Sequence, residues 1–202
     1  MPGYLSFREY IRWLPDEATE PTVTIVLSGK ESGAFVDVRF MKNAIGTLDW
    51  AFAGFRHADG ANRARFEHLL DSRTPDPTSV DDSGTTTALP EGRSLERGMM
   101  ANPDTGALTD YEELWREEEA PHATIVRRLD GSVWKAHVGN WQLEVGRNDH
   151  HCWAWQASWG GGSPDWHILH RTANVGEAKF LPDKHRQLLE WAGDDWEILE
   201  YS

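Results

Sequence analysis

The chain has 202 residues, and its 33 acidic residues against 20 Lys and Arg give a formal net charge of −13. Because this charge repels phosphate backbones and anionic lipid surfaces, and no Lys/Arg-rich run offsets it, we expect neither a nucleic-acid nor a membrane partner. The single cysteine, Cys152, excludes an intrachain disulfide and a multi-cysteine zinc site, and without a signal-peptide core or an apolar run near the ~20 residues of a membrane span we expect a cytoplasmic protein.

The first half of the chain is predicted to form short antiparallel strands. Residues 22–27 and 35–40 alternate between two faces with a period of two, and they are rich in β-branched and aromatic side chains. Asp37 and Arg39 fall on the same face of the second strand, where they form either a buried ion pair or a solvated edge. Gly-containing turns punctuate these runs, as is typical of a sandwich or barrel.

A long polar stretch follows, from residue 72 to residue 107. Pro, Ser, Thr, Asp and Gly dominate its composition. A connection of this length is usually a linker or a functional loop. We therefore expect a mobile linker here, with residues 75–89 as its most mobile part.

The second half contains further strands and the one clear helix. Residues 134–138 and 151–156 alternate with a period of two. A helix is predicted over residues 182–191, because Pro182 suits a first turn and Gly193 follows as a stop. Nine of the 11 Trp and seven of the nine His lie after residue 108, so the two halves differ in composition.

Parts of the two halves match each other at a constant offset of 100 residues. Residues 21–26 and 121–126 share four identities in six positions, and residues 66–70 fall on 166–170. Such self-similarity indicates duplication of one structural unit. We therefore predict an N-terminal β-barrel domain over residues 1–108, which includes the linker, and a C-terminal β-barrel domain over residues 109–202.

The usual signatures of nucleotide, metal and nucleophilic chemistry are absent from the sequence. It contains no phosphate-binding Gly-rich motif, no H-E-x-x-H and no G-x-S-x-G. His167 and His170 point to opposite faces of a strand, which is unfavourable for a shared metal. Cys152 reads as a small buried thiol more readily than as a nucleophile. We expect no metal and no cofactor.

Several short motifs resemble those of the fungal HRI family, which is named for a yeast protein that interacts with a casein-kinase-I homologue. The motifs lie at residues 49–54, 96–106, 111–115, 145–147 and 196–201. The resemblance covers residues 22–201 and implies two tandem calycin-like (lipocalin-like) antiparallel barrels. Some relatives occur in fungal secondary metabolism, where a similar protein closes a dihydrofuran ring on a phenalenone by cofactor-free hydroalkoxylation, the addition of a phenol hydroxyl across a prenyl alkene.

The resemblance therefore implies a cofactor-independent cyclase that acts on a small polycyclic aromatic substrate. The alternatives are a non-catalytic protein that binds an apolar ligand or a protein kinase partner, and a purely structural protein; a homodimer is a further alternative. The His- and Trp-rich segment 150–155 is a departure from the yeast-type pattern.

Hydroalkoxylation needs a proton donor, a base for the phenol and a dry, aromatic wall that stabilises a cation. The candidate acids and bases are Asp37, Glu113, His151 and His167, with Arg39 as an anion binder. The candidate pocket aromatics are Trp50, Trp115, Trp153, Trp155 and Trp166. Each Trp is also a good filler of a barrel core. We expect the pocket in the second half of the chain, where Trp and His are concentrated, or at the seam between the halves.

Overall fold

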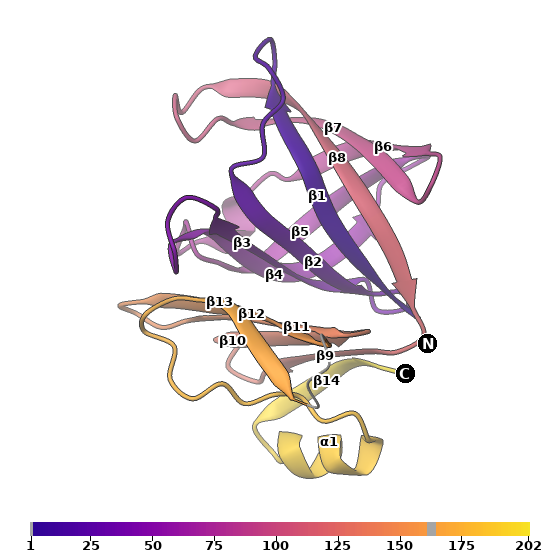
Figure 1. Ribbon diagram of the computed structural model, residues 1–202, viewed down its shortest axis with the longest axis vertical. Coiled ribbons are helices and arrows are strands. Elements are labelled where there is room, and N and C mark those ends of the chain that lie inside the picture. Colours follow the sequence, from indigo (N-terminus) through magenta and orange to yellow (C-terminus); the bar gives the residue numbers. More distant parts are fainter. Residues whose placement is uncertain (1, 161–164) are drawn as a thin grey trace.

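The computed structural model describes residues 2–160 and 165–202, and these residues are mainly β. They form two sheets and one α-helix, arranged in three layers: a barrel, a second sheet and a helix on the far side of that sheet (Figure 1). No helix in the described part of the chain is long and apolar enough to cross a membrane.

The first sheet is a closed barrel of eight antiparallel strands. Its strands are β1 (Gly3–Trp13), β2 (Thr22–Gly29), β3 (Ala34–Met41), β4 (Leu48–Ala58), β5 (Arg63–Asp71), β6 (Ser83–Leu89), β7 (Arg93–Ala101) and β8 (Leu108–Ala120). They are neighbours in chain order, and β8 closes the ring by pairing with β1. This is the up-and-down arrangement, in which no strand is left with a free edge.

The second sheet is open, so the prediction of a second barrel is wrong. Its strands are β9 (Ala123–Arg128), β10 (Val133–Val138), β11 (Trp141–Arg147), β12 (Cys152–Trp159), β13 (Trp166–Arg171) and β14 (Trp196–Tyr201). Their order is β13-β12-β11-β10-β9-β14. The last strand returns to pair with β9 rather than with β13, and the two edges of the sheet therefore stay apart.

The boundary between the two sheets lies later in the chain than the predicted domain boundary after residue 108. β8 pairs with both β7 and β1, so the barrel continues to Ala120 and the second sheet begins at Ala123. The offset of 100 residues aligns β2 with β9. However, β5 lies three strands after β2, whereas β13 lies four strands after β9, and the halves do not share one strand order.

Residues 72–107 form part of the barrel wall, which corrects the prediction of a mobile linker. They contain a short 3-10 helix (Pro77–Ser79) and the strands β6 and β7, which pair with each other and with β5 and β8. Most side chains of β6 face solvent. The polar composition therefore reflects a wall with water on one side, and the run Thr85–Thr87 supplies the β-branched residues that favour a strand.

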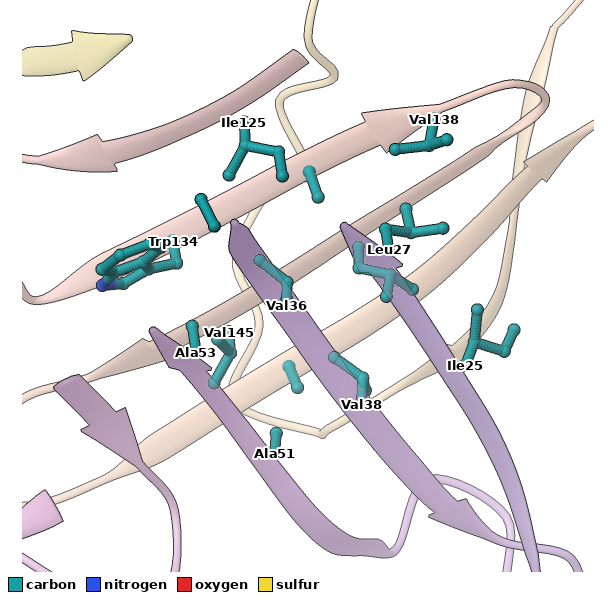
Figure 2. Packing of buried hydrophobic residues seen from close by; sticks show 14 of the residues in the cluster. Ile25, Leu27, Val36, Val38, Ala51, Ala53, Ile125, Trp134, Val138 and Val145 are labelled. Carbon is teal, nitrogen blue, oxygen red and sulfur yellow. The ribbon is translucent and has the colours of Figure 1, made fainter. Parts of the chain in front are cut away.

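The main apolar core lies outside the barrel, between its wall and the second sheet. Ile25, Leu27, Val36 and Val38 of the barrel are at most 1% exposed, and they pack on the sheet (Figure 2). The facing side chains are Ile125, Trp134, Val138 and Val145. One face of β2, β3 and β4 is therefore buried against the sheet, while the other face lines the inside of the barrel.

The predicted helix is confirmed, with a later start, as α1 (His185–Ala192). It packs on the side of the second sheet that faces away from the barrel, where Leu188 joins Val126 and Leu181 in a smaller apolar cluster. Gly193 ends the helix with a φ of 51°, in the left-handed region that suits glycine.

Gly54 allows two barrel strands to approach each other closely. A β-carbon at this position would fall on the backbone carbonyl oxygen of Glu67 in β5. We expect Gly54→Ala to destabilise the fold by about 1–3 kcal/mol, because the strands must shift to relieve the clash. Urea denaturation measures the loss. The control is Gly176→Ala, where a β-carbon meets no atom within 4 Å; equal effects of the two substitutions would contradict this explanation.

Candidate functional site

The closed barrel encloses a cavity of about 760 Å³, and every barrel strand contributes to its lining. This volume lies within the range of ~300–1,000 Å³ that is common for small-molecule sites. The lining is chemically mixed. Phe35, Phe52 and Phe66 supply apolar surface, while the inward-facing positions of β3, β7 and β8 supply charged groups.

The structure brings together Asp37, Arg39 and Glu113, three of the predicted site residues. Arg39 donates from Nε to Oδ1 of Asp37 at 3.0 Å and from Nη2 to Oδ2 at 2.8 Å. Its Nη1 lies 3.6 Å from Oε1 of Glu113. All three side chains are buried and line the cavity, so the ion-pair alternative holds for Asp37 and Arg39 rather than the solvated edge.

A second arginine, which the sequence did not single out, completes this network. Arg8 of β1 donates from Nη1 to Oε1 of Glu113 at 2.5 Å and from Nε to Oε2 of Glu20 at 2.8 Å. Burial raises the pKa of Asp37, and the charge of Arg39 offsets only part of this effect. Buried charges of this kind are stable only when they are paired, and each arginine here contacts two carboxylates.

Trp50 and Trp115, two predicted pocket aromatics, have different positions. The guanidinium carbon of Arg39 lies 4.7 Å from the ring centroid of Trp50, which therefore supports the arginine from one side. Trp115 lines the cavity directly. Its indole Nε1 is buried and has no hydrogen-bond partner among the described residues, although such donors normally find an acceptor.

Behind the cavity wall, His68 of β5 lies between two aspartates. Its Nδ1 is 2.8 Å from Oδ2 of Asp71, and its Nε2 is 3.1 Å from Oδ2 of Asp82. The ring stacks on Phe52 with centroids 4.2 Å apart. Burial alone would lower the pKa of His68, but the hydrogen bonds and charges of the two aspartates outweigh it and raise this pKa. Asp82 also lines the cavity.

Glu96 of β7 is a carboxyl group of the cavity that is strongly biased toward its neutral form. Burial, together with the nearby charges of Glu113 and Asp82, raises the pKa of Glu96 to about 8. The hydroxyl of Tyr111 donates to Oε1 of Glu96 at 2.9 Å. The cavity therefore places a carboxyl group that retains its proton at neutral pH beside further carboxyl groups, an arrangement that acid–base catalysis uses.

The raised pKa of Glu96 predicts a pH dependence of stability. Between the ordinary value of 4.5 and about 8, the folded state retains a proton that the unfolded state has lost. Unfolding free energy therefore decreases as pH rises through this window, by at most about 1.4 kcal/mol per pH unit from this group. Glu96→Gln should gain stability relative to the unsubstituted protein as pH rises, as urea denaturation across the window would measure. A constant difference at all pH values would contradict the assignment.

The remaining predicted residues lie on the second sheet and do not line the barrel cavity. His151, before β12, and His167, in β13, are both exposed. Among the described residues, neither belongs to a group of three or more His, Cys, Asp or Glu that could hold a metal. Trp155 is fully buried against Phe180, on which Trp166 also stacks. The expectation of a pocket in the second half, or at the seam between the halves, stays a prediction, whereas the cavity of about 760 Å³ lies inside the barrel.

Lys135 explains much of the tryptophan content of the second half. Its ammonium group pairs with Glu144 at 2.5 Å and lies 5.5–5.8 Å from the rings of Trp155, Trp191 and Trp196. The indole of Trp153 donates to Glu144 at 2.8 Å. These contacts offset the cost of burying the charge of Lys135, which is only 5% exposed, and they give these rings a structural role.

Cys152 is partly buried, and its thiol lies 3.7 Å from the carbonyl oxygen of Ser72. Burial raises the pKa of this thiol. Because the thiolate is the reactive form, the environment favours an inert cysteine over a nucleophile.

Three of the sequence motifs converge on the barrel site. Motif 111–115 places Tyr111, Glu113 and Trp115 on the cavity wall. Trp50, from motif 49–54, donates to the Asp71 carboxylate, and Arg147, from motif 145–147, donates to the Asp71 carbonyl oxygen at 2.6 Å. A family model described as Protein HRI1 matches residues 4–200. The chain belongs to the HRI1 family. Searches of curated proteins and of solved structures returned no match.

The family match covers both the barrel and the second sheet, so HRI1 family membership applies to the whole architecture. The C-terminal motif joins the two parts: Glu200 of β14 accepts a hydrogen bond at 2.8 Å from the backbone N–H of Ser32, in the turn at the rim of the cavity. The second sheet therefore supports the barrel both through the apolar core and at this turn.

Five residues of the site were not predicted from the sequence: Arg8, His68, Asp82, Glu96 and Tyr111. A signal existed for Tyr111, because it lies two and four residues before the predicted Glu113 and Trp115 and so shares their face of β8. No comparable signal marked Arg8 or His68. Glu113, the partner of Arg8, is 105 residues away in the sequence, and only closure of the barrel brings the two together, whereas the partners of His68 lie three and 14 residues later in the chain.

Proposed function

We propose that this HRI1-family protein binds a small, largely apolar molecule inside its barrel. The observation that carries the proposal is the closed eight-stranded barrel around a cavity of about 760 Å³ whose wall includes the unpartnered indole N–H of Trp115. Eight-stranded barrels of the lipocalin type are wide enough for one small ligand. We therefore retain the calycin-like comparison for the eight-stranded barrel alone.

The lining indicates the class of ligand. Phe35, Phe52 and Phe66 suit aromatic ring systems, and the charged groups of β3, β7 and β8 suit oxygen substituents. The Trp115 N–H would donate to a carbonyl or ether oxygen. A polycyclic aromatic molecule with a few oxygen functions meets these requirements.

Binding can be tested with prodan, a fluorescent aromatic ketone whose emission depends on its surroundings. We expect prodan to bind in the barrel and Trp115→Phe to weaken its binding about 2- to 10-fold, the effect of one lost hydrogen bond. The control is Trp159→Phe, at a Trp that is 49% exposed on the second sheet. Equal affinities of the two variants, or no binding at all, would count against the proposed site.

We further propose that the cavity catalyses a cofactor-independent cyclisation, the intramolecular hydroalkoxylation of a prenylated phenol such as a phenalenone. The reaction is redox-neutral: the phenol O–H bond and the alkene π bond break, and new C–O and C–H bonds form. Protonated Glu96 supports this chemistry as the donor to the alkene carbon. An ionised carboxylate would accept the phenol proton, and aromatic rings would stabilise the developing cation by roughly 0.5–2 kcal/mol.

The catalytic proposal is tested by incubating the purified protein with a prenylated phenalenone, with neither metal nor nucleotide added. The expected product is one enantiomer of the cyclic ether, formed faster than without protein. A racemic product at the uncatalysed rate would leave the binding function as the role of the barrel and would overturn the cyclase.

A further inference from the structure

We infer that Asp82 is the base of the cavity and that His68 and Asp71 hold it in position behind the wall. This inference rests on the proposed binding of a ligand in the barrel, and it identifies the group that receives a proton from a hydroxyl of that ligand. Asp82 was not among the residues that the sequence pointed to.

Asp71, His68 and Asp82 form a hydrogen-bonded chain of side chains, which runs from the closed interior of the protein to the cavity. The side chains of Asp71 and His68 are 1% and 0% exposed, whereas that of Asp82 is 9% exposed. Asp82 alone of the three lines the cavity. A ligand in the barrel can therefore contact the chain at one end only, the Asp82 carboxylate.

The inner end of the chain is fixed by several hydrogen bonds. The indole Nε1 of Trp50 lies 3.1 Å from each oxygen of Asp71, and the backbone N–H of Arg73 donates to Oδ1 at 2.7 Å. At the outer end, His68 is the one hydrogen-bond donor to the Asp82 carboxylate among the described residues. The other lone pairs of Asp82 are therefore free to accept a proton from a ligand.

The geometry also favours a protonated His68. Each ring nitrogen faces a carboxylate oxygen, and both nitrogens can donate only when the imidazole is protonated. The aromatic rings of Phe35, Trp50 and Phe52 surround the rest of the ring, so the two aspartates are the charged groups that face it. The imidazolium places a donor and a positive charge beside the Asp82 carboxylate and holds it at the cavity wall.

In the proposed reaction, the hydroxyl proton of the ligand moves to Oδ of Asp82, and the oxygen keeps the electron pair with which it attacks carbon. Glu96 gives up the proton that forms the new C–H bond. After product release, exchange with water returns the proton of Asp82 to solvent and reprotonates Glu96. His68 remains an imidazolium throughout and orients the base without exchanging its own protons.

The base can be tested with 2-naphthol, whose hydroxyl becomes strongly acidic in the excited state and whose neutral and ionised forms emit at different wavelengths. We expect bound 2-naphthol to emit as the naphtholate with the unsubstituted protein. Asp82→Asn should abolish this emission, and Asp71→Asn should reduce it, because Asp82 loses its alignment. The matched control is Asp81→Asn, at the exposed neighbouring aspartate, which should leave the emission unchanged. Equal naphtholate emission from Asp82→Asn and Asp81→Asn would overturn the assignment.

A second measurement needs neither a ligand nor a variant. Nitrogen NMR of the unsubstituted protein should show both ring nitrogens of His68 protonated at neutral pH. A neutral His68 tautomer would overturn the positioning role, whatever the variants do. Failure of both prodan and 2-naphthol to bind would instead contradict the proposed function of the barrel, so the two failures can be distinguished.

Discussion

Arg39→Met is expected to lower the free energy of unfolding by about 3–5 kcal/mol, the usual cost of removing one partner from a buried ion pair. The substitution leaves Asp37 without the guanidinium that contacts both its oxygens, and it weakens the charge balance of Glu113. It also removes a cation from the faces of Trp50 and Phe52. Methionine fills a similar volume, so the loss reports on charge rather than on a void.

Urea denaturation of Arg39→Met and of a surface control measures this effect. The control is Arg127→Met, which breaks an ion pair with Glu197 whose side chains are 31% and 43% exposed. Surface pairs of this kind contribute at most about 1 kcal/mol. Adding Asp37→Asn to Arg39→Met should recover part of the lost stability, because the unpaired charge is removed. Similar small losses at positions 39 and 127 would show that the network inside the barrel is not formed.

Glu96→Gln is expected to lower the rate of cyclisation by about 10²–10⁴-fold, the usual contribution of a general acid. Glutamine has a similar shape but no acidic proton, so prodan should still bind with nearly unchanged affinity. In the unsubstituted protein the rate should decrease as pH rises through about 8, because Glu96 then loses the proton that it donates.

The control for this experiment is Glu119→Gln, at an exposed residue of β8 that pairs with Lys30. Its rate and pH profile should match those of the unsubstituted protein. A Glu96→Gln variant with full activity, or a rate that increases as pH rises through about 8, would contradict the role of Glu96 as the donor.

The period-two pattern of β3 predicted the strand but could not tell which face lies inside the barrel. Val36 and Val38 resemble core residues of a barrel, yet they pack outward on the second sheet (Figure 2). Asp37 and Arg39, on the other face of the strand, line the cavity. Both faces of β3 are buried, and alternation alone assigns neither face to the interior.

The composition of the second half did not point to the barrel cavity. Trp153, Trp155 and Trp166 suggested an aromatic cavity, but their rings are used to cover Phe180 and to surround the buried Lys135 with its partner Glu144. A high local density of Trp is compatible with either role. The outcome depends on which segments cover the sheet, and in this chain α1 and the segment that carries Phe180 do so.

The features of the fold that could not be predicted from the sequence depend on contacts between residues far apart in the chain. The pairing of β8 with β1 closes the barrel and places Arg8 against Glu113, 105 residues away. Residues 83–101 have the polar composition of a loop, but they form a wall because β5 and β8 provide neighbours on both sides. Neither pairing has a local signal, since backbone hydrogen bonds between strands carry no sequence information of their own.

The most direct test of the ligand-binding barrel is a crystal structure of the protein soaked with a prenylated phenalenone. We predict electron density for the ligand inside the barrel, with an oxygen within hydrogen-bond distance of the Trp115 indole N–H and a hydroxyl against the Asp82 carboxylate. Density on the surface of the second sheet beside His151 and Trp153, with none inside the barrel, would contradict the account.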